Sequence, residues 1–163
     1  MNIIPPADRH AQRETGVFTV AAPVGSVVSY ELCEHTADIA VEASGETFAA
    51  VTAAVADGLA AAMCESVPVE GDRFGLSVTA ESREALLFEY LDELIYERDV
   101  RAVLPVDNEA TITEQSGAWR LDGSARGVPL SAVTAREVKA VTYSEMVVEE
   151  RDGEWYAYVV FDV

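Results

Sequence analysis

The sequence predicts an α+β domain in which two helices pack on a mainly antiparallel sheet. Two stretches, one following residue 46 and one following residue 82, repeat apolar residues at spacings of three and four, the period of a helix with one buried face. The other apolar runs are short, rich in β-branched and aromatic residues, and separated by turn sequences, which is typical of strands. Strands that flank and follow two helices favour an α+β arrangement.

The first 27 residues differ from the rest of the chain. Their periodicity is weak, and they contain several residues that break regular structure, namely Pro5, Pro6, Pro23 and Gly25. We therefore expect residues 1–27 to form a flexible N-terminal arm. The patterns sharpen from residue 28, and no linker interrupts the chain beyond that point, so residues 28–163 are expected to fold as one domain.

The two predicted helices have recognisable starts and apolar faces. The first begins at Glu46 or Thr47, and its apolar positions are Phe48, Val51, Val55, Leu59 and Met63. The second is capped by Ser82, whose hydroxyl can accept a hydrogen bond from the first turn. Its apolar stripe is Leu86, Leu87, Tyr90, Leu91, Leu94 and Ile95.

Strands are expected on both sides of these helices. The predicted strands cover residues 28–32, 39–43, 74–80, 100–106, 110–114, 119–126, 137–148 and 155–163. Turns are expected at residues 34–37, 107–108 and 116–117. The Asp152-Gly153 pair between two β-branched runs is a strong hairpin signal.

The chain is strongly acidic. Its 11 basic and 29 acidic residues give a formal charge of −18, and so negative a surface repels phosphate backbones, which argues against tight autonomous nucleic-acid binding. Ten basic residues are arginine, and Lys139 is the sole lysine. This bias is halophile-like, typical of adaptation to a high-salt cytoplasm, although an acidic protein that docks on a basic partner is the alternative.

The sequence contains no sign of a membrane span or of a familiar catalytic site. No apolar run approaches the roughly 20 residues that a membrane helix needs, and charged residues interrupt the N-terminal stretch where a signal peptide requires a continuous apolar segment. We therefore expect a cytoplasmic protein. A Gly-rich phosphate loop, a nucleophile elbow and a His-Glu-x-x-His motif are absent.

Three polar positions allow both a functional and a structural interpretation. Asp38 follows His35 and Thr36 at a strand start, where it could bind a hard cation or simply bond the backbone of a turn. Lys139 lies among apolar strand residues, where it could offer its charge to a site or extend along the sheet. Asp162 precedes the terminal carboxylate of Val163; two such carboxylates repel unless a cation lies between them, and a frayed end is the alternative.

Taken together, three motifs in order resemble the archease family. They are His35-Thr36-Ala37-Asp38-Ile39, Val138-Lys139-Ala140-Val141-Thr142-Tyr143 and Phe161-Asp162-Val163, the last flush with the end of the sequence. The segment from Glu84 to Leu87 and the segment from Leu91 to Tyr96 also match the second helix of that family. The resemblance extends from about Tyr30 to the end and excludes the arm.

The resemblance implies an accessory role. Archeases are cofactors of the RtcB-type tRNA-splicing RNA ligase: they promote its guanylylation by GTP and its repeated turnover, and an older interpretation of the family is chaperone-like. The family implies that Asp38, Asp162 and Val163 bind a divalent cation, usually calcium, and that Lys139 supports activation of the ligase. The protein would then be no enzyme itself, and tRNA would be reached only through the ligase.

Two positions depart from the family pattern, and two other functions remain open. Glu34 stands where many archeases have Asp, and Ser144 stands where many have His. A general protein-binding chaperone would need an exposed apolar patch, which the sequence does not show outside the faces needed for the core. A metal-dependent hydrolase would need a metal with open coordination, and only two acidic side chains are candidate ligands.

Overall fold

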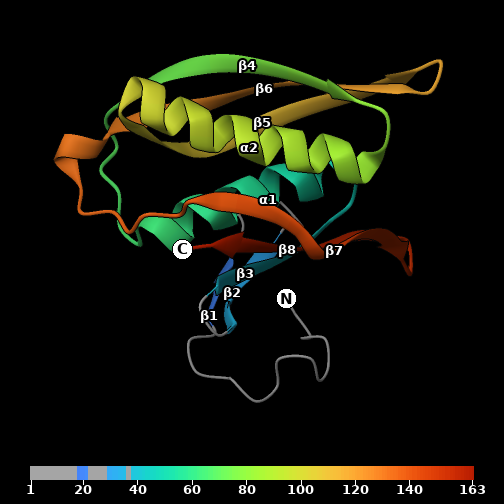
Figure 1. Ribbon diagram of the computed structural model, residues 1–163, viewed down its shortest axis with the longest axis horizontal. Helices are drawn as coiled ribbons and strands as arrows, with labels where there is room; N and C mark the ends of the chain where they lie inside the picture. The colour runs from blue at the N-terminus through green and yellow to red at the C-terminus, as the bar shows by residue number, and fades with distance from the viewer. Residues whose placement is uncertain (1–17, 22–28, 36–37) are drawn as a thin grey trace.

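The structure is a computed structural model that describes residues 18–21, 29–35 and 38–163 (Figure 1). Its two α-helices are α1 (Phe48–Met63) and α2 (Arg83–Arg101), and a short 3₁₀ helix, η2, covers Leu130–Ala132. The strands are β1 (Phe18–Ala21), β2 (Ser29–His35), β3 (Asp38–Gly45), β4 (Asp72–Ala80), β5 (Val103–Gln115), β6 (Ala118–Pro129), β7 (Ala140–Arg151) and β8 (Glu154–Asp162).

The strands form two antiparallel sheets with the helices between them. The order in the five-stranded sheet is β1-β2-β3-β8-β7, and the order in the three-stranded sheet is β4-β6-β5. Figure 1 shows α1 and α2 as the middle layer, and the main core of buried residues lies there. The predicted α+β class is confirmed. The division into two sheets was not predicted, because periodicity identifies a strand but not its partner.

Helix α1 begins and packs as its sequence suggests. The Thr47 hydroxyl accepts a hydrogen bond from the Ala50 backbone N at 3.0 Å, which confirms the predicted start. Near its middle the helix comes very close to the five-stranded sheet. A Cβ atom on Gly58 would lie 2.5 Å from a methyl carbon of Val41, so only glycine permits this approach.

Helix α2 is longer than predicted. Its cap is confirmed, since Ser82 Oγ accepts from the Ala85 N at 3.1 Å. The strand predicted over residues 100–106 is wrong at its start, because Val100 and Arg101 belong to the helix, which ends at Ala102 in the left-handed region (φ 56°). Arg98 helps to hold this last part of the helix, since its Nη1 donates to the Val138 carbonyl at 2.8 Å.

The turn predicted at residues 107–108 is a bulge within one strand. The β5–β6 register shifts between Val106 and Glu109, and Asp107 has a positive φ of 51°. Asn108 points inward, where its backbone N and its Nδ2 both donate to Oδ1 of Asp57 on α1. A contact 51 residues away in sequence therefore keeps the chain in the sheet where turn residues suggested a reversal.

Strand β7 begins later than predicted and is also bulged. It starts at Ala140 rather than at residue 137, and its pairing with β8 shifts between Thr142 and Val147. The hairpin that joins β7 to β8 turns at Asp152 and Gly153, whose φ values of 53° and 84° confirm the predicted turn. Neither helix in the described part of the chain has the length and apolar character needed to cross a membrane.

Candidate functional site

Asp38 and Asp162 are paired directly across two neighbouring strands. Asp38 is the first residue of β3 and Asp162 the last of β8, and the antiparallel register places them opposite each other. In such a pair the Cβ atoms lie roughly 5 Å apart and the side chains share one face. The two carboxylates, which are distant in the sequence, are therefore neighbours at one end of the five-stranded sheet.

This pair lies on the face of the sheet that points away from the helices. Along each strand the side chains alternate, so Val41 and Val159 enter the main core while Asp38 and Asp162 point to the other side. Asp38 is half-buried and Asp162 is exposed. The pair is thus accessible from outside the helix layer.

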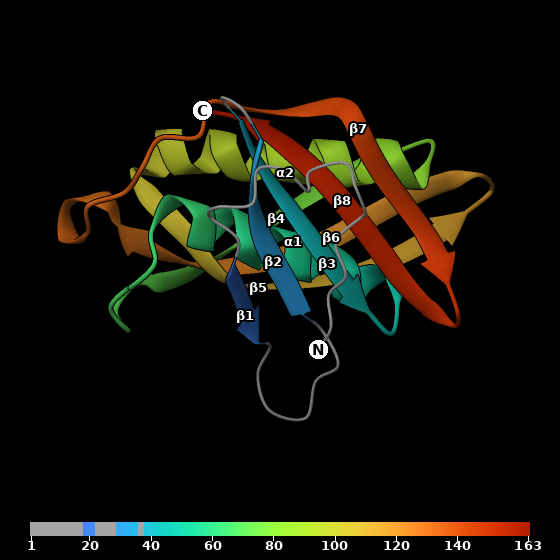
Figure 2. The same ribbon diagram turned by 90° about the horizontal axis from the view of Figure 1, so that it is seen from below.

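The backbone of Lys139 is attached to the same end of β8. Its N donates to the Asp162 carbonyl oxygen at 2.8 Å, and the next residue, Ala140, pairs with Asp162 from the other side. Figure 2 shows β3, β8 and β7 side by side, with the C-terminus where β8 ends. Asp162 therefore lies between Asp38 and the segment that carries Lys139.

The environment of Lys139 differs from the one predicted. The sequence suggested a position among apolar residues within the strand predicted over residues 137–148. Lys139 instead precedes β7 and is exposed, Val141 enters the core, and Tyr143 lies in the β7 bulge. The exposure of Lys139 is compatible with the first of the two alternatives, in which it offers its charge to a site.

The groups at this end of the sheet have the chemistry of a hard-cation site. The side chains of Asp38 and Asp162 and the terminal carboxylate of Val163 offer only oxygen ligands, which Ca²⁺ prefers. Val163 is 40% exposed and directly follows Asp162. Within the described residues no three His, Cys, Asp or Glu side chains converge. Residues 36–37 of the first motif lie outside the described residues.

Two buried carboxylates on the same face were not predicted. Glu31 and Glu42 are opposite each other in the β2–β3 register and are only 7% and 2% exposed. The Tyr156 hydroxyl donates to Glu42 Oε2 at 2.7 Å. The alternation of side chains could have indicated them, because it places one acidic residue in the middle of each strand, on the face opposite the helices. The buried apolar residues Ala40 and Val160 lie between them and the Asp38–Asp162 pair.

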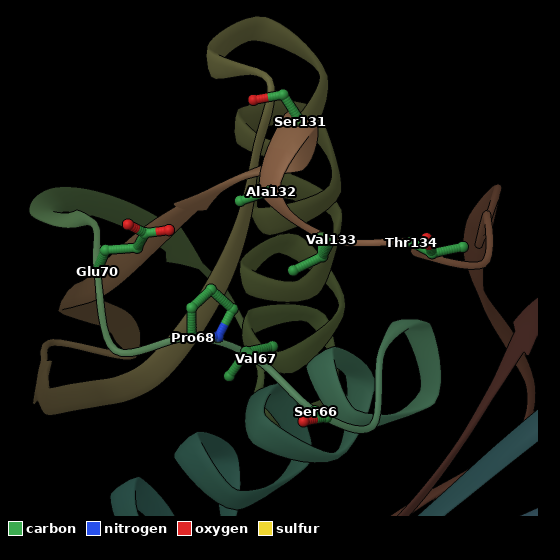
Figure 3. Close-up of a pocket in the computed structure, with 8 residues that line it drawn as sticks. All are labelled: Ser66, Val67, Pro68, Glu70, Ser131, Ala132, Val133 and Thr134. Atoms are coloured by element: carbon green, nitrogen blue, oxygen red, sulfur yellow. The ribbon is translucent and has the colours of Figure 1, made fainter.

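A shallow cavity of about 610 Å³ lies away from these residues (Figure 3). It is formed by the segment after α1 and by the segment that begins at η2. Its lining residues are Ser66, Val67, Pro68, Glu70, Ser131, Ala132, Val133 and Thr134. It contains none of the predicted site residues.

The chain has clear relatives among known proteins. The model of the Archease protein family matches residues 30–163. The chain belongs to the archease family. It is 34% identical to protein archease of Pyrococcus furiosus over 142 residues, which cover 82% of this chain and 98% of that protein. It is 33% identical to protein archease of Methanosarcina mazei over 139 residues, with 82% and 95% covered.

Solved archease-like structures support the fold. The solution structure of protein 1598 of Methanobacterium thermoautotrophicum aligns with a TM-score of 0.73 and 29% identity, over 82% of this chain and 98% of that one. The crystal structure of an archease, a possible chaperone, from Thermotoga maritima aligns with a TM-score of 0.56 and 20% identity, over 88% and 98%. At that identity the second comparison supports the fold alone. The predicted family is confirmed, and the family match begins at residue 30, after β1.

Proposed function

We propose that this archease-family chain is an accessory protein, and not itself an enzyme, that activates an RtcB-type tRNA-splicing RNA ligase in the cytoplasm. It would promote guanylylation of the ligase by GTP and so allow multiple turnover. The observation that supports this proposal is the pairing of Asp38 with Asp162 and of Asp162 with the Lys139 segment. The three motifs that carry the family resemblance thereby meet at one end of one sheet.

The proposed role of the acidic residues is to hold a divalent cation, for which we propose calcium. Asp38, Asp162 and the terminal carboxylate of Val163 would be its protein ligands. Such a cation supplies positive charge that offsets the repulsion between neighbouring carboxylates. The ordered acidic end of the sheet would then be presented to the ligase in a defined conformation.

The proposed role of Lys139 is to bring a positive charge to the active centre of the ligase. Its backbone is held by a hydrogen bond to the Asp162 carbonyl, and its side chain is exposed. The position of the residue is thus fixed, while the ammonium group can reach toward a partner. With a net charge of −18, tRNA would be contacted only through the ligase.

The test is transfer of labelled GMP from GTP to the purified ligase, with and without this chain. Stimulation by the wild-type chain is expected, and Asp38→Asn, Asp162→Asn and Lys139→Gln should each remove most of it. Lys139→Arg retains the charge and should keep part of the effect. Glu114→Gln, an exposed acid at the far end of β5, is the matched control and should stimulate as the wild type does. A wild-type chain that leaves guanylylation unchanged would refute the proposal.

A general protein-binding chaperone is the second candidate. The observation that favours it is the exposure of Tyr96, Val100 and Tyr143, which are 58%, 60% and 52% exposed and which the sequence did not mark as a patch. This function predicts suppression of the aggregation of unrelated unfolded proteins. Activity on such clients, without any effect on the ligase, would favour it over the accessory role.

A further inference from the structure

Helix α2 and the start of β7 run antiparallel and are joined at two points. The Arg98 guanidinium donates to the Val138 carbonyl at 2.8 Å, and the ring of Phe88 stacks on that of Tyr143 with centroids 4.1 Å apart and planes at 5°. Ten helical residues rise about 15 Å, and five extended residues span about 16 Å. The two lengths agree, so residues 138–143 run alongside the helix between these two contacts (Figure 1).

The bulge in β7 presents Tyr143 to solvent. Thr142 pairs with Val160 and Val147 with Tyr158, so four residues of β7 stand opposite the single residue Val159. The backbone accommodates them with a positive φ of 63° at Glu145. Tyr143 remains 52% exposed, with one ring face against Phe88 and the rest open. Bulges commonly re-aim side chains next to functional sites.

The outward face of α2 continues this exposed area. Residues 89, 92, 96 and 100 recur at spacings of three and four and so form one ridge. Tyr96 and Val100 on this ridge are more than half exposed. We call the set the α2–β7 surface; it consists of Phe88, Glu89, Asp92, Tyr96, Val100 and Tyr143.

The charges of α2 are sorted between its faces. Each of its arginines contacts other groups of the same chain: Arg83 lies against Trp119 and Trp155, Arg98 contacts Val138 and Asp99, and Arg101 contacts Glu97 and Phe74. Glu89 and Asp92 form no ion pair within the described residues. The ridge thus combines unneutralised carboxylates with exposed aromatic rings.

Neighbouring carboxylates on α2 also repel one another. The pKa of Glu93 is raised, first by desolvation, then by Glu97, and then by the charges of Asp92 and Glu89. Positive charge delivered by a partner would relieve this repulsion. Arginine is suited to the task because its guanidinium pairs with carboxylates and also stacks on tyrosine rings.

We infer that the α2–β7 surface docks an arginine-bearing surface of the protein partner. This inference rests on the proposed function, in which the partner is the ligase. One short segment of the chain connects α2 with the candidate site, since Val138, whose carbonyl accepts from Arg98, directly precedes Lys139, whose N donates to the Asp162 carbonyl. Tyr96 and Tyr143 provide the aromatic anchors, and Glu89 and Asp92 provide the charge.

The test measures the Kd for the purified ligase together with guanylylation. Tyr96→Ala and Asp92→Arg change exposed side chains, and each is expected to weaken binding about tenfold or more, as hot-spot residues do. Tyr143→Phe keeps the ring stack and should retain most of the affinity. Val69→Ala, at a 91% exposed apolar residue outside this surface, and Glu114→Gln are matched controls that should leave the Kd unchanged.

The outcomes separate this inference from the proposed function. Loss of affinity in the α2 variants, with affinity retained but stimulation lost in Asp38→Asn, would support both. Full affinity and stimulation in Tyr96→Ala and Asp92→Arg would overturn the docking surface and leave the accessory role intact. A wild-type chain that neither binds nor stimulates the ligase would overturn both. A dimer in sedimentation that Tyr96→Ala dissociates would identify a second copy as the occupant and overturn the inference.

Discussion

Asn108 donates two hydrogen bonds to one carboxylate oxygen of Asp57, from its backbone N at 3.0 Å and from its Nδ2 at 2.9 Å. The pair fastens α1 to the bulge of β5, and so joins the helix layer to the three-stranded sheet. Asn108 is 7% exposed, which makes these donors costly to leave without an acceptor.

Asp57→Ala should therefore destabilise the protein. We expect the free energy of unfolding to fall by about 2 kcal/mol, because both Asn108 donors lose their acceptor inside the protein. Asp57→Asn keeps a carbonyl oxygen at this position and should cost less. Urea denaturation of both variants measures the difference, and equal losses would contradict a role for the acceptor atom.

Asp57 should also make stability depend on pH in a defined direction. Its pKa is raised, chiefly by desolvation and further by Asp107, against the lowering effect of the Asn108 hydrogen bonds. The folded protein thus holds this proton more tightly than the unfolded chain does. The resulting stability is present below the ordinary pKa of 3.8 and is lost as the pH rises through the raised value.

The measurement is the difference in unfolding free energy between Asp57→Asn and the wild type at a series of pH values. As the pH rises above 3.8, the wild type should lose stability relative to Asp57→Asn, and the difference should then level off. Asp122→Asn is a control of opposite sign. The hydrogen bonds from Arg120 and Ser77 lower the pKa of Asp122, so rising pH should favour the wild type there. The same trend in both variants would contradict the assignment.

Arg83 should contribute to stability by joining the two sheets. Its guanidinium lies 4.8 Å from the ring centroid of Trp119 on β6 and 5.0 Å from that of Trp155 on β8. Arg83→Ala should cost about 1 kcal/mol, typical of exposed cation–π contacts. These are the only two tryptophans in the sequence, so intrinsic fluorescence should report the change directly. Arg83→Lys keeps the charge and should cost less, and an unchanged spectrum in Arg83→Ala would contradict the contact.

The pairing of Asp38 with Asp162 predicts that Asp162→Asn affects stability differently with and without a bound cation. In excess chelator, Asp162→Asn should raise the Tm because directly opposed like charges on neighbouring strands destabilise a sheet. When millimolar Ca²⁺ is added, the wild type should gain stability and the variant little, because binding to the folded state stabilises it. Equal calcium shifts in the two proteins would contradict a cation site at Asp38 and Asp162.

Local features of this fold could be predicted from the sequence. The caps at Thr47 and Ser82 and the hairpin turn at Gly153 depend on residues within a few positions of each other, where propensity and hydrogen-bonding chemistry decide the conformation. The two helices were predicted for the same reason, since their apolar period is local.

Features that depend on distant partners could not be predicted in this way. Asp107 and Asn108 are typical turn residues, and only the contact with Asp57 shows that they form a bulge. The pairing of Asp38 with Asp162 depends on strand order, which no local pattern encodes. The family resemblance brought these two residues together in the prediction, whereas chemistry alone left each with a structural alternative.

The two edge strands of the five-stranded sheet, β1 and β7, affect whether this protein aggregates at high concentration. A long, flat strand at the edge of a sheet exposes backbone N–H and C=O groups that can pair with another chain and start aggregation. On one side β2 is already paired with β1, a strand of only four residues that precedes the region matched by the family. On the other side the β7 bulge interrupts the straight run of the backbone. Both sides of the sheet are thus poor templates for growth into a larger aggregate.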